Sequence, residues 1–103
     1  MSSVTPLTIS AEHPALAGHF PGAPIVPGVV LLDAALRAVE LDAATAATRW
    51  RIGTAKFISL VRPGEELLLE HECLANGSLR FSVLRGGQPV AHGVLVPDEP
   101  QER

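Results

Sequence analysis

The chain has 103 residues, of which 47% are apolar, and a formal net charge of −3 from 8 Lys and Arg against 11 Asp and Glu. This length suits one small domain, the apolar content excludes wholesale disorder, and the charge argues against nucleic acid as the main partner. Cys73 is the only cysteine, and we find no signal-like start and no apolar run near the roughly 20 residues of a membrane span, so we expect a cytoplasmic, soluble protein without a membrane span.

Two different patterns occupy the first half of the chain. Residues 4–9 alternate loosely and include β-branched side chains, which predicts a short strand. Residues 11–27 contain four prolines and two glycines, so they cannot form a regular helix or a central strand. Good helix formers then run from Gly28 to about Ala47, with apolar residues around nearly the whole circumference. The pattern predicts one buried helix.

The second half of the chain changes to the period of strands. Strands are predicted over residues 50–61, 65–74, 79–84 and 90–96, and turn sequences separate them at Pro63-Gly64, Asn76-Gly77 and Gly86-Gly87. Such short connections favour an antiparallel meander. The predicted fold class is α+β: a curled antiparallel sheet around one long helix, in a single domain over residues 1–97 with a polar tail over residues 98–103. Because one small sheet leaves a long free edge, we expect two protomers to pair.

The stretch from His19 to Asp33 carries most of the candidate chemistry. His19 lies in a loop stiffened by prolines and could act as a general base, although a loop histidine bonded to a backbone carbonyl is the simpler interpretation. The free N–H groups of a helix that begins at Gly28 suit an oxygen that gains negative charge, or they simply begin the helix. Asp33 is an acid in an apolar segment, which indicates function or an interface; with Arg37 and Glu40 it could also form a solvated stripe.

Taken together, these residues resemble a known pattern. The segment resembles the 3-hydroxyacyl-[acyl carrier protein] dehydratases of the hot-dog fold, the FabZ and FabA type, and in length the compact dehydratases encoded with polyene, including aryl polyene, or polyketide pathways. The motif of that family, GHFPGxPxxPGV, is matched without a gap by residues 18–29. An acid follows the histidine of the motif by fourteen positions, as Asp33 follows His19 (33 − 19 = 14). The flanks LTISAEHPALAGHFPG and AKFISLVRPGEELLLE extend the resemblance over most of the chain.

The resemblance implies an activity and a role for each residue. His19 would remove the α-proton of a 3-hydroxyacyl thioester, and the Gly28 N–H would bind the thioester carbonyl. Asp33 of the other protomer would help to protonate the 3-hydroxyl and expel it as water, giving the trans-2-enoyl thioester. No cofactor or metal is implied, because the substrate rides on the phosphopantetheine arm of acyl carrier protein in fatty-acid or polyene/polyketide-type biosynthesis. Candidates for the substrate pocket are Phe20, Pro27, Val29, Val30, Leu32, Arg37 and Phe57. A basic face that could meet the acidic carrier comprises Arg49, Arg51, Lys56 and Arg62, which could equally be ordinary solvated positions.

One departure from the family concerns the acid. Many relatives have Gln four residues after the acid, where this chain has Arg37, and a nearby guanidinium favours the carboxylate form. If the two groups pair, Asp33 is a poorer proton donor and could instead orient a water molecule. Two alternative functions stay open, namely a hot-dog thioesterase and a non-catalytic hot-dog subunit that completes a heterodimer. The dimer itself could be a homodimer or a heterodimer.

Overall fold

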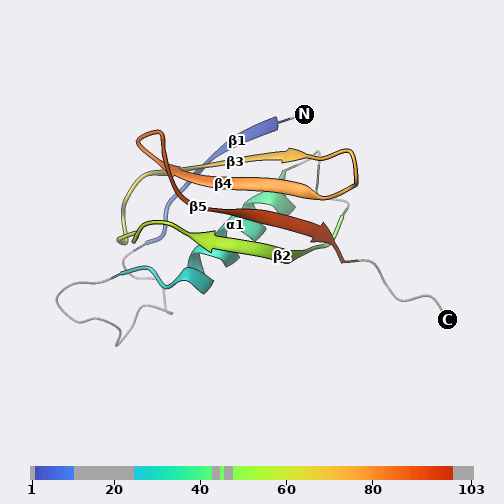
Figure 1. Ribbon diagram of the computed structural model, residues 1–103. Helices are drawn as coiled ribbons and strands as arrows, with labels where there is room; N and C mark the ends of the chain where they lie inside the picture. Colours follow the sequence, from blue (N-terminus) through green and yellow to red (C-terminus); the bar gives the residue numbers. More distant parts are fainter. Residues whose placement is uncertain (1, 11–24, 43–44, 46–47, 99–103) are drawn as a thin grey trace.

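A five-stranded antiparallel sheet and one helix make up the part of the chain that the computed structural model describes, residues 2–10, 25–42, 45 and 48–98 (Figure 1). The sheet has the order β1-β3-β4-β5-β2, so β1 and β2 are its two edges. The elements in chain order are β1 (Ser2–Leu7), α1 (Gly28–Leu41), β2 (Trp50–Phe57), β3 (Leu67–Cys73), β4 (Leu79–Arg85) and β5 (Gln88–Pro97).

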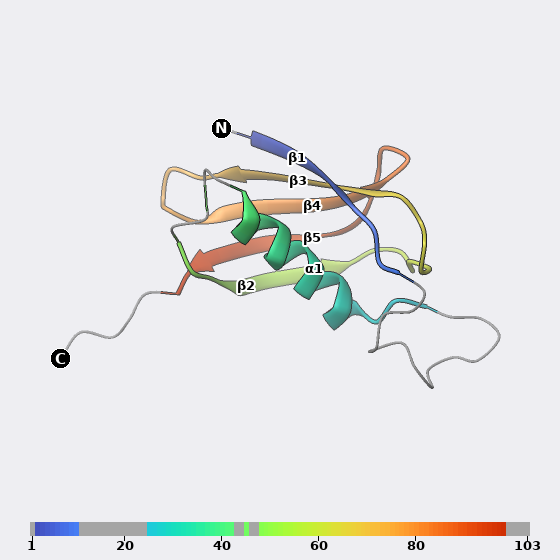
Figure 2. The same cartoon turned by 180° about the vertical axis from the view of Figure 1, so that it is seen from behind.

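Helix α1 lies diagonally across one face of the sheet, as the two opposite views show (Figures 1 and 2). Residues alternate along β3 and β4 so that one face is apolar and buried, with Leu69, Leu79 and Phe81 at most 1% exposed. The helix side of this core consists of Val30, Leu31, Ala35 and Val39.

The opposite face of α1 is exposed in the protomer, which corrects the prediction of a helix buried all round. Val29 is 72% exposed and Leu41 85%, and the polar residues Asp33, Arg37 and Glu40 lie on this outward face. A single sheet covers only one side of a helix, so the remaining apolar side chains need a second subunit to be buried.

The helix ends at Leu41, earlier than the predicted end near Ala47. Asp42 adopts an extended conformation (φ −73°, ψ 126°), and its N–H donates to the carbonyl of Val39 at 3.2 Å. The hydroxyl of Thr45 donates to the carbonyls of Val39 and Asp42, and thereby satisfies acceptors at the helix end. Threonine and aspartate favour such local bonds over a continued helix, which the count of helix formers alone does not register.

The sheet confirms only part of the predicted meander. Strands β3, β4 and β5 follow one another through the turns at Asn76-Gly77 and Gly86-Gly87, where Gly77, Gly86 and Gly87 have positive φ. By contrast, β2 pairs with β5 and not with β3, so Pro63-Gly64 does not form a hairpin. Residues 58–66, hereafter the crossover, instead carry the chain from one edge of the sheet to the strand beside the other edge (Figure 2). A Pro-Gly sequence predicts a change of chain direction, but it does not determine whether the strands before and after it pair with each other.

Strand β2 is a free edge that is well suited to further pairing. All residues from Arg51 to Phe57 are exposed, and the register with β5 shifts between Ile52 and Thr54. Gly93 lets β2 approach β5 closely, because a Cβ at its position would collide with the carbonyl oxygen of Thr54. In the part of the chain that is described, no helix has the length and apolar character needed to cross a membrane.

Candidate active site

The start of α1 leaves two backbone N–H groups outside the helical hydrogen bonds. Pro27 occupies the N-cap position with extended backbone angles (φ −60°, ψ 146°), and no side chain caps the helix. The first helical bonds run from the N–H groups of Val30 and Leu31 to the carbonyl of Pro27, at 3.0 and 3.2 Å. The N–H groups of Gly28 and Val29 therefore lie ahead of the first helical bond. Together with the helix dipole, they form a place where a developing oxyanion would be stabilised.

Phe57 forms one wall of this helix start. A Cβ built on Gly28 would lie 2.6 Å from Cζ of Phe57, so the ring packs directly on the glycine backbone. The ring is 49% exposed, and it is the last residue of β2. Two predicted site residues, Gly28 and Phe57, are thus brought together from elements far apart in the sequence. Only a residue without a side chain fits at position 28 while the ring keeps this place.

Asp33 and Arg37 form an ion pair on the outward face of α1. The Nε of Arg37 donates to Oδ2 of Asp33 at 3.0 Å, across one turn of the helix. The side chains are 54% exposed for Asp33 and 75% for Arg37. The pair holds one carboxylate oxygen and leaves the other available. The structure thus contains both the ion pair and the solvated stripe that the sequence suggested, and in the protomer Asp33 is not a buried acid.

The other predicted site residues fall into two groups. His19 and Phe20 lie outside the described residues, so their roles stay predictions. Among the candidates for the pocket, Pro27 and Leu32 are half-buried, Val29 is exposed, and Val30 packs in the core at 7% exposure. Whether these four line an acyl tunnel depends on a second subunit and stays a prediction as well.

Sequence reasoning missed the backbone contact that fixes the approach to Gly28. The N–H of Val26 donates to the carbonyl of Val61 in the crossover at 2.7 Å, and both residues are buried. Since both partners are backbone groups, no side-chain pattern signals this bond. The only hint in the sequence is Pro27, which holds the preceding residue in the extended conformation that pairs with a neighbouring chain.

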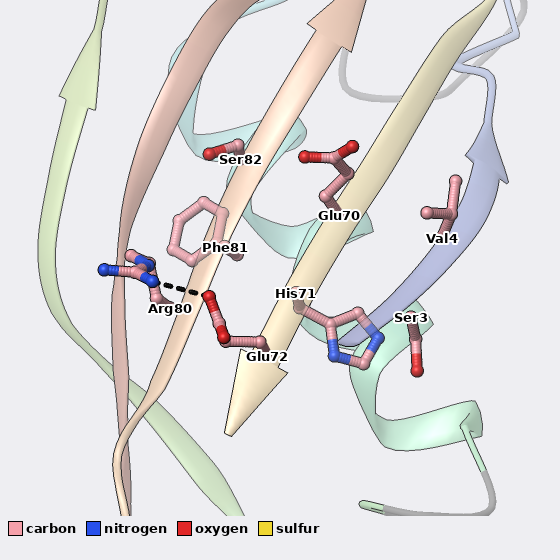
Figure 3. A pocket seen from close by; sticks show the side chains of 8 residues that line it. All are labelled: Ser3, Val4, Glu70, His71, Glu72, Arg80, Phe81 and Ser82. Atoms are coloured by element: carbon pink, nitrogen blue, oxygen red, sulfur yellow. Dashed lines mark hydrogen bonds and ion pairs between the residues drawn. The ribbon is translucent and has the colours of Figure 1, made fainter. Parts of the chain in front are cut away.

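Two hollows in the described surface lie away from the helix start at Gly28. One of about 310 Å³ lies on β1, β3 and β4 (Figure 3), and its polar groups include Glu70 and the ion pair between Arg80 and Glu72 at 2.5 Å. Another, of about 460 Å³, runs between β1 and α1 and touches the site residues only at Arg37. We assign the chemistry to the helix start, because an acyl pocket shared by two subunits is incomplete in one of them.

Buried His71 is a polar link within the core. Its Nε2 lies 3.3 Å from Oδ2 of Asp42 at the end of α1, within ion-pair distance but without the geometry of a hydrogen bond. His92 is exposed on β5, while His13 lies outside the described residues.

The comparison with known families decides the affiliation of the chain. The model of the ApeI-like family, described as ApeI dehydratase, matches residues 2–94. The chain belongs to this dehydratase family. A relative named 3-hydroxyacyl-[acyl-carrier-protein] dehydratase FabZ, from Chlamydia trachomatis serovar L2, is 36% identical over 107 residues, which cover 91% of this chain and 70% of the relative. A relative of the same name from Chloroflexus aggregans is 42% identical over 69 residues, covering 60% of this chain and 48% of that protein.

Solved structures with the same fold extend this result. The dehydratase heterocomplex ApeI:P from Xenorhabdus doucetiae matches with a TM-score of 0.75 at 24% identity and covers 93% of this chain and 86% of that chain. An uncharacterized protein from Erwinia carotovora subsp. atroseptica matches with a TM-score of 0.73 at 27% identity, covering 98% and 86%. The predicted hot-dog fold and the predicted dehydratase class are therefore confirmed.

Proposed function

We propose that this protein dehydrates a 3-hydroxyacyl thioester carried on acyl carrier protein to the trans-2-enoyl thioester, in fatty-acid or polyene/polyketide-type biosynthesis. The observation that carries the proposal is the helix start, where the N–H groups of Gly28 and Val29 precede the first helical bond and the Phe57 ring packs on Gly28. The same helix presents Asp33 outward. Curated relatives named for this reaction support the substrate class. The phosphopantetheine arm belongs to the substrate, and the proposed reaction needs no cofactor or metal of its own.

The proposed reaction divides into three tasks. The thioester carbonyl accepts a hydrogen bond from the Gly28 N–H, which stabilises the enolate that forms when the α-proton leaves. His19 takes this α-proton and becomes an imidazolium. The C3–O bond then breaks, and the 3-hydroxyl leaves as water with the proton that His19 returns. Asp33, positioned by its ion pair with Arg37, accepts a hydrogen bond from the leaving hydroxyl and fixes its direction.

A second hot-dog subunit completes the proposed site. The free edge of β2 can pair with another strand, and apolar side chains next to it are exposed: Phe57 at 49%, Ile58 at 51% and Leu60 at 67%. A second copy of this chain and a different hot-dog subunit both fit such an edge. The similar structure from Xenorhabdus doucetiae is a dehydratase heterocomplex, which favours the second arrangement for that relative.

The carrier protein would dock on the basic positions around β2. Arg49, Arg51, Lys56 and Arg62 are all exposed, and Asp98 lies 4.0 Å from Nε of Arg51. Cationic side chains around a site entrance favour encounter with an acidic partner and weaken with salt. We therefore propose that the carrier binds this face when it presents its acyl chain. The proposed location of the reaction is the cytoplasm, as expected from the sequence.

The direct test is to incubate the protein with a 3-hydroxyacyl carrier-protein substrate and to follow formation of the enoyl thioester. His19→Ala and Asp33→Asn should each lose most activity while they keep the circular dichroism spectrum and the assembly mass of the wild type. Release of free thiol in place of the enoyl product would instead indicate a thioesterase. An inactive wild type beside an active control dehydratase would overturn the proposal.

A further inference from the structure

The crossover holds both flanks of the segment that carries His19. On the N-terminal side, the N–H of Gly64 donates to the carbonyl of Ile9 at 2.8 Å. On the C-terminal side, the carbonyl of Val61 accepts from the N–H of Val26 at 2.7 Å. Ile9, Val26 and Val61 are all at most 5% exposed. One short piece of chain thus bonds to Ile9 and to Val26, and Val26 lies two residues before Gly28.

The crossover is held in turn by Arg85, the last residue of β4. One guanidinium nitrogen, Nη1, donates to the carbonyl of Leu60 at 2.8 Å and to Oε1 of Glu65 at 3.0 Å. The other, Nη2, donates to the hydroxyl of Ser59 at 3.0 Å. A rigid, forked guanidinium can serve these acceptors at once, which an ammonium group cannot. Glu65 closes the arrangement, because its Oε1 also accepts from the N–H of Arg62 at 2.7 Å.

Arg85 anchors the crossover along its length. At its start, the N–H groups of Ile58 and Ser59 donate to the carbonyl of Val90 on β5. Beyond Ser59, Arg85 supplies the side-chain bonds from the sheet, and they reach the carbonyl of Leu60, next to Val61. A shift of this carbonyl would move the acceptor of the Val26 N–H and the backbone that leads from Phe57. The positions of the site residues Gly28 and Phe57 therefore both depend on the crossover.

We propose that Arg85 is a positioning residue of the dehydratase site, acting through the crossover on both flanks of the His19 segment and on the start of α1. The inference rests on the proposed function for its catalytic readout only. The contacts from which it is argued are independent of substrate.

The chain offers a matched control on the same strand. Arg80 also lies on β4 and forms an ion pair, with Glu72 at 2.5 Å, but it has no hydrogen bond to the crossover among the described contacts. Arg85→Met and Arg80→Met each remove one guanidinium and one ion pair while they keep most of the side-chain stem. A fall in kcat caused only by the change in net charge or by a less stable β4 would appear in both variants.

The experiment combines steady-state kinetics on a 3-hydroxyacyl carrier-protein substrate with amide hydrogen exchange of the whole assembly. Arg85→Met should lower kcat about 10-fold or more with KM changed less than about 3-fold, whereas Arg80→Met should stay within about 2-fold of wild type. Exchange at the Val26 and Gly64 amides should become at least about 10-fold faster in Arg85→Met, while the core amides of Leu69 and Phe81 keep their rates. Arg85→Lys should show smaller changes of the same kind, and it replaces the methionine variant if that variant does not fold.

The outcomes separate the two proposals. Unchanged kcat and unchanged exchange at Val26 and Gly64 in Arg85→Met would overturn the positioning role. Faster exchange that is equal at Val26 and Phe81 would overturn it too, because it indicates a general loss of stability. If the wild type itself is inactive beside an active control enzyme, the proposed function fails, and exchange at Val26 and Gly64 still decides whether Arg85 holds the flanks.

Discussion

Replacing Arg37 by leucine tests whether the partner of Asp33 contributes to the reaction or only to the surface. In the structure Arg37 donates one hydrogen bond, through Nε, to Oδ2 of Asp33 at 3.0 Å. Leucine removes this donor and has nearly the same helix propensity as arginine. Glutamine keeps an N–H donor that can reach the same carboxylate. The pair Arg37→Leu and Arg37→Gln therefore differs mainly in whether Asp33 keeps a partner.

The expected effect on stability is small. Both side chains are more than half exposed, at 75% and 54%, and an exposed i,i+4 ion pair contributes about 0.3–0.5 kcal/mol. For a domain of this size, that corresponds to a fall in Tm of roughly 1–4 °C, provided that protein concentration is held constant. The effect on the reaction should be larger, because loss of the charge-assisted bond frees the carboxylate to rotate away from the leaving hydroxyl. We expect kcat to fall about 10-fold, equivalent to about 1.4 kcal/mol, in Arg37→Leu.

The assay is the dehydration of a 3-hydroxyacyl carrier-protein substrate, measured for wild type and both variants alongside thermal unfolding. Arg37→Gln should stay within about 3-fold of the wild-type kcat, because its amide can replace the lost donor. Full activity in Arg37→Leu would show that Asp33 needs no partner. An increase of kcat in Arg37→Leu would show that the pair restrains Asp33 and that the acid form takes part in the reaction.

Three further predictions concern the helix start, the crossover and the free edge. Gly28→Ala should lower kcat about 10-fold. It should change the free energy of unfolding by less than about 1 kcal/mol, because the new methyl group meets the far end of the half-exposed Phe57 ring. Activity equal to that of wild type would show that the reaction does not need close approach of the substrate to Gly28. The pKa of Glu65 is held below its ordinary value of 4.5, first by the N–H of Arg62 and then by Arg85. Its charge therefore stabilises the folded state above pH 4.5, and this contribution is lost as the pH falls through the lowered pKa. In thermal melts, Glu65→Gln should therefore lose less stability than wild type on acidification. An equal decrease of Tm with pH in both proteins would contradict this. Leu60→Asp, at a position 67% exposed, should reduce the assembly to single protomers in light scattering, and an unchanged mass would exclude this side chain from the interface.

The sequence predicts the elements of the fold better than their connections. Strand periods and the turns at Asn76-Gly77 and Gly86-Gly87 predict β3, β4 and β5 with small errors at their ends. The partner of β2 could not be read in the same way, because alternation fixes which face a residue occupies but not which neighbour a strand pairs with. The end of α1 was missed because Thr45 caps the helix from beyond its last residue, through a bond that helix propensity does not contain.

In the candidate site, too, the sequence predicts some features and misses others. Gly28, Asp33 and Phe57 are all candidates from the sequence, and in the structure Phe57 packs on Gly28. The support beneath them was not predicted, because it consists of backbone carbonyls and of Arg85, a residue with no motif around it. A motif identifies groups that touch a substrate, whereas the groups that hold those groups in place are recognisable only from the folded contacts.

The geometry of α1 favours a site shared between subunits. Asp33 follows Gly28 by five residues (33 − 28), which places it about 7.5 Å along the axis and about 140° around it. A thioester bound at the Gly28 N–H therefore faces away from Asp33 of the same chain, and Asp33 points to where a second helix can lie.

If the second subunit is a copy, two identical sites result. If it is a different hot-dog subunit, this chain contributes Gly28 to one site and Asp33 to the other, and the two sites depend on different residues. We infer that Asp33→Asn and Gly28→Ala in separate chains of a mixed assembly distinguish the two cases. In a homodimer, mixing the two variants restores one complete site, with up to about half of the activity of two wild-type sites, whereas a heterodimer gains nothing from the mixture.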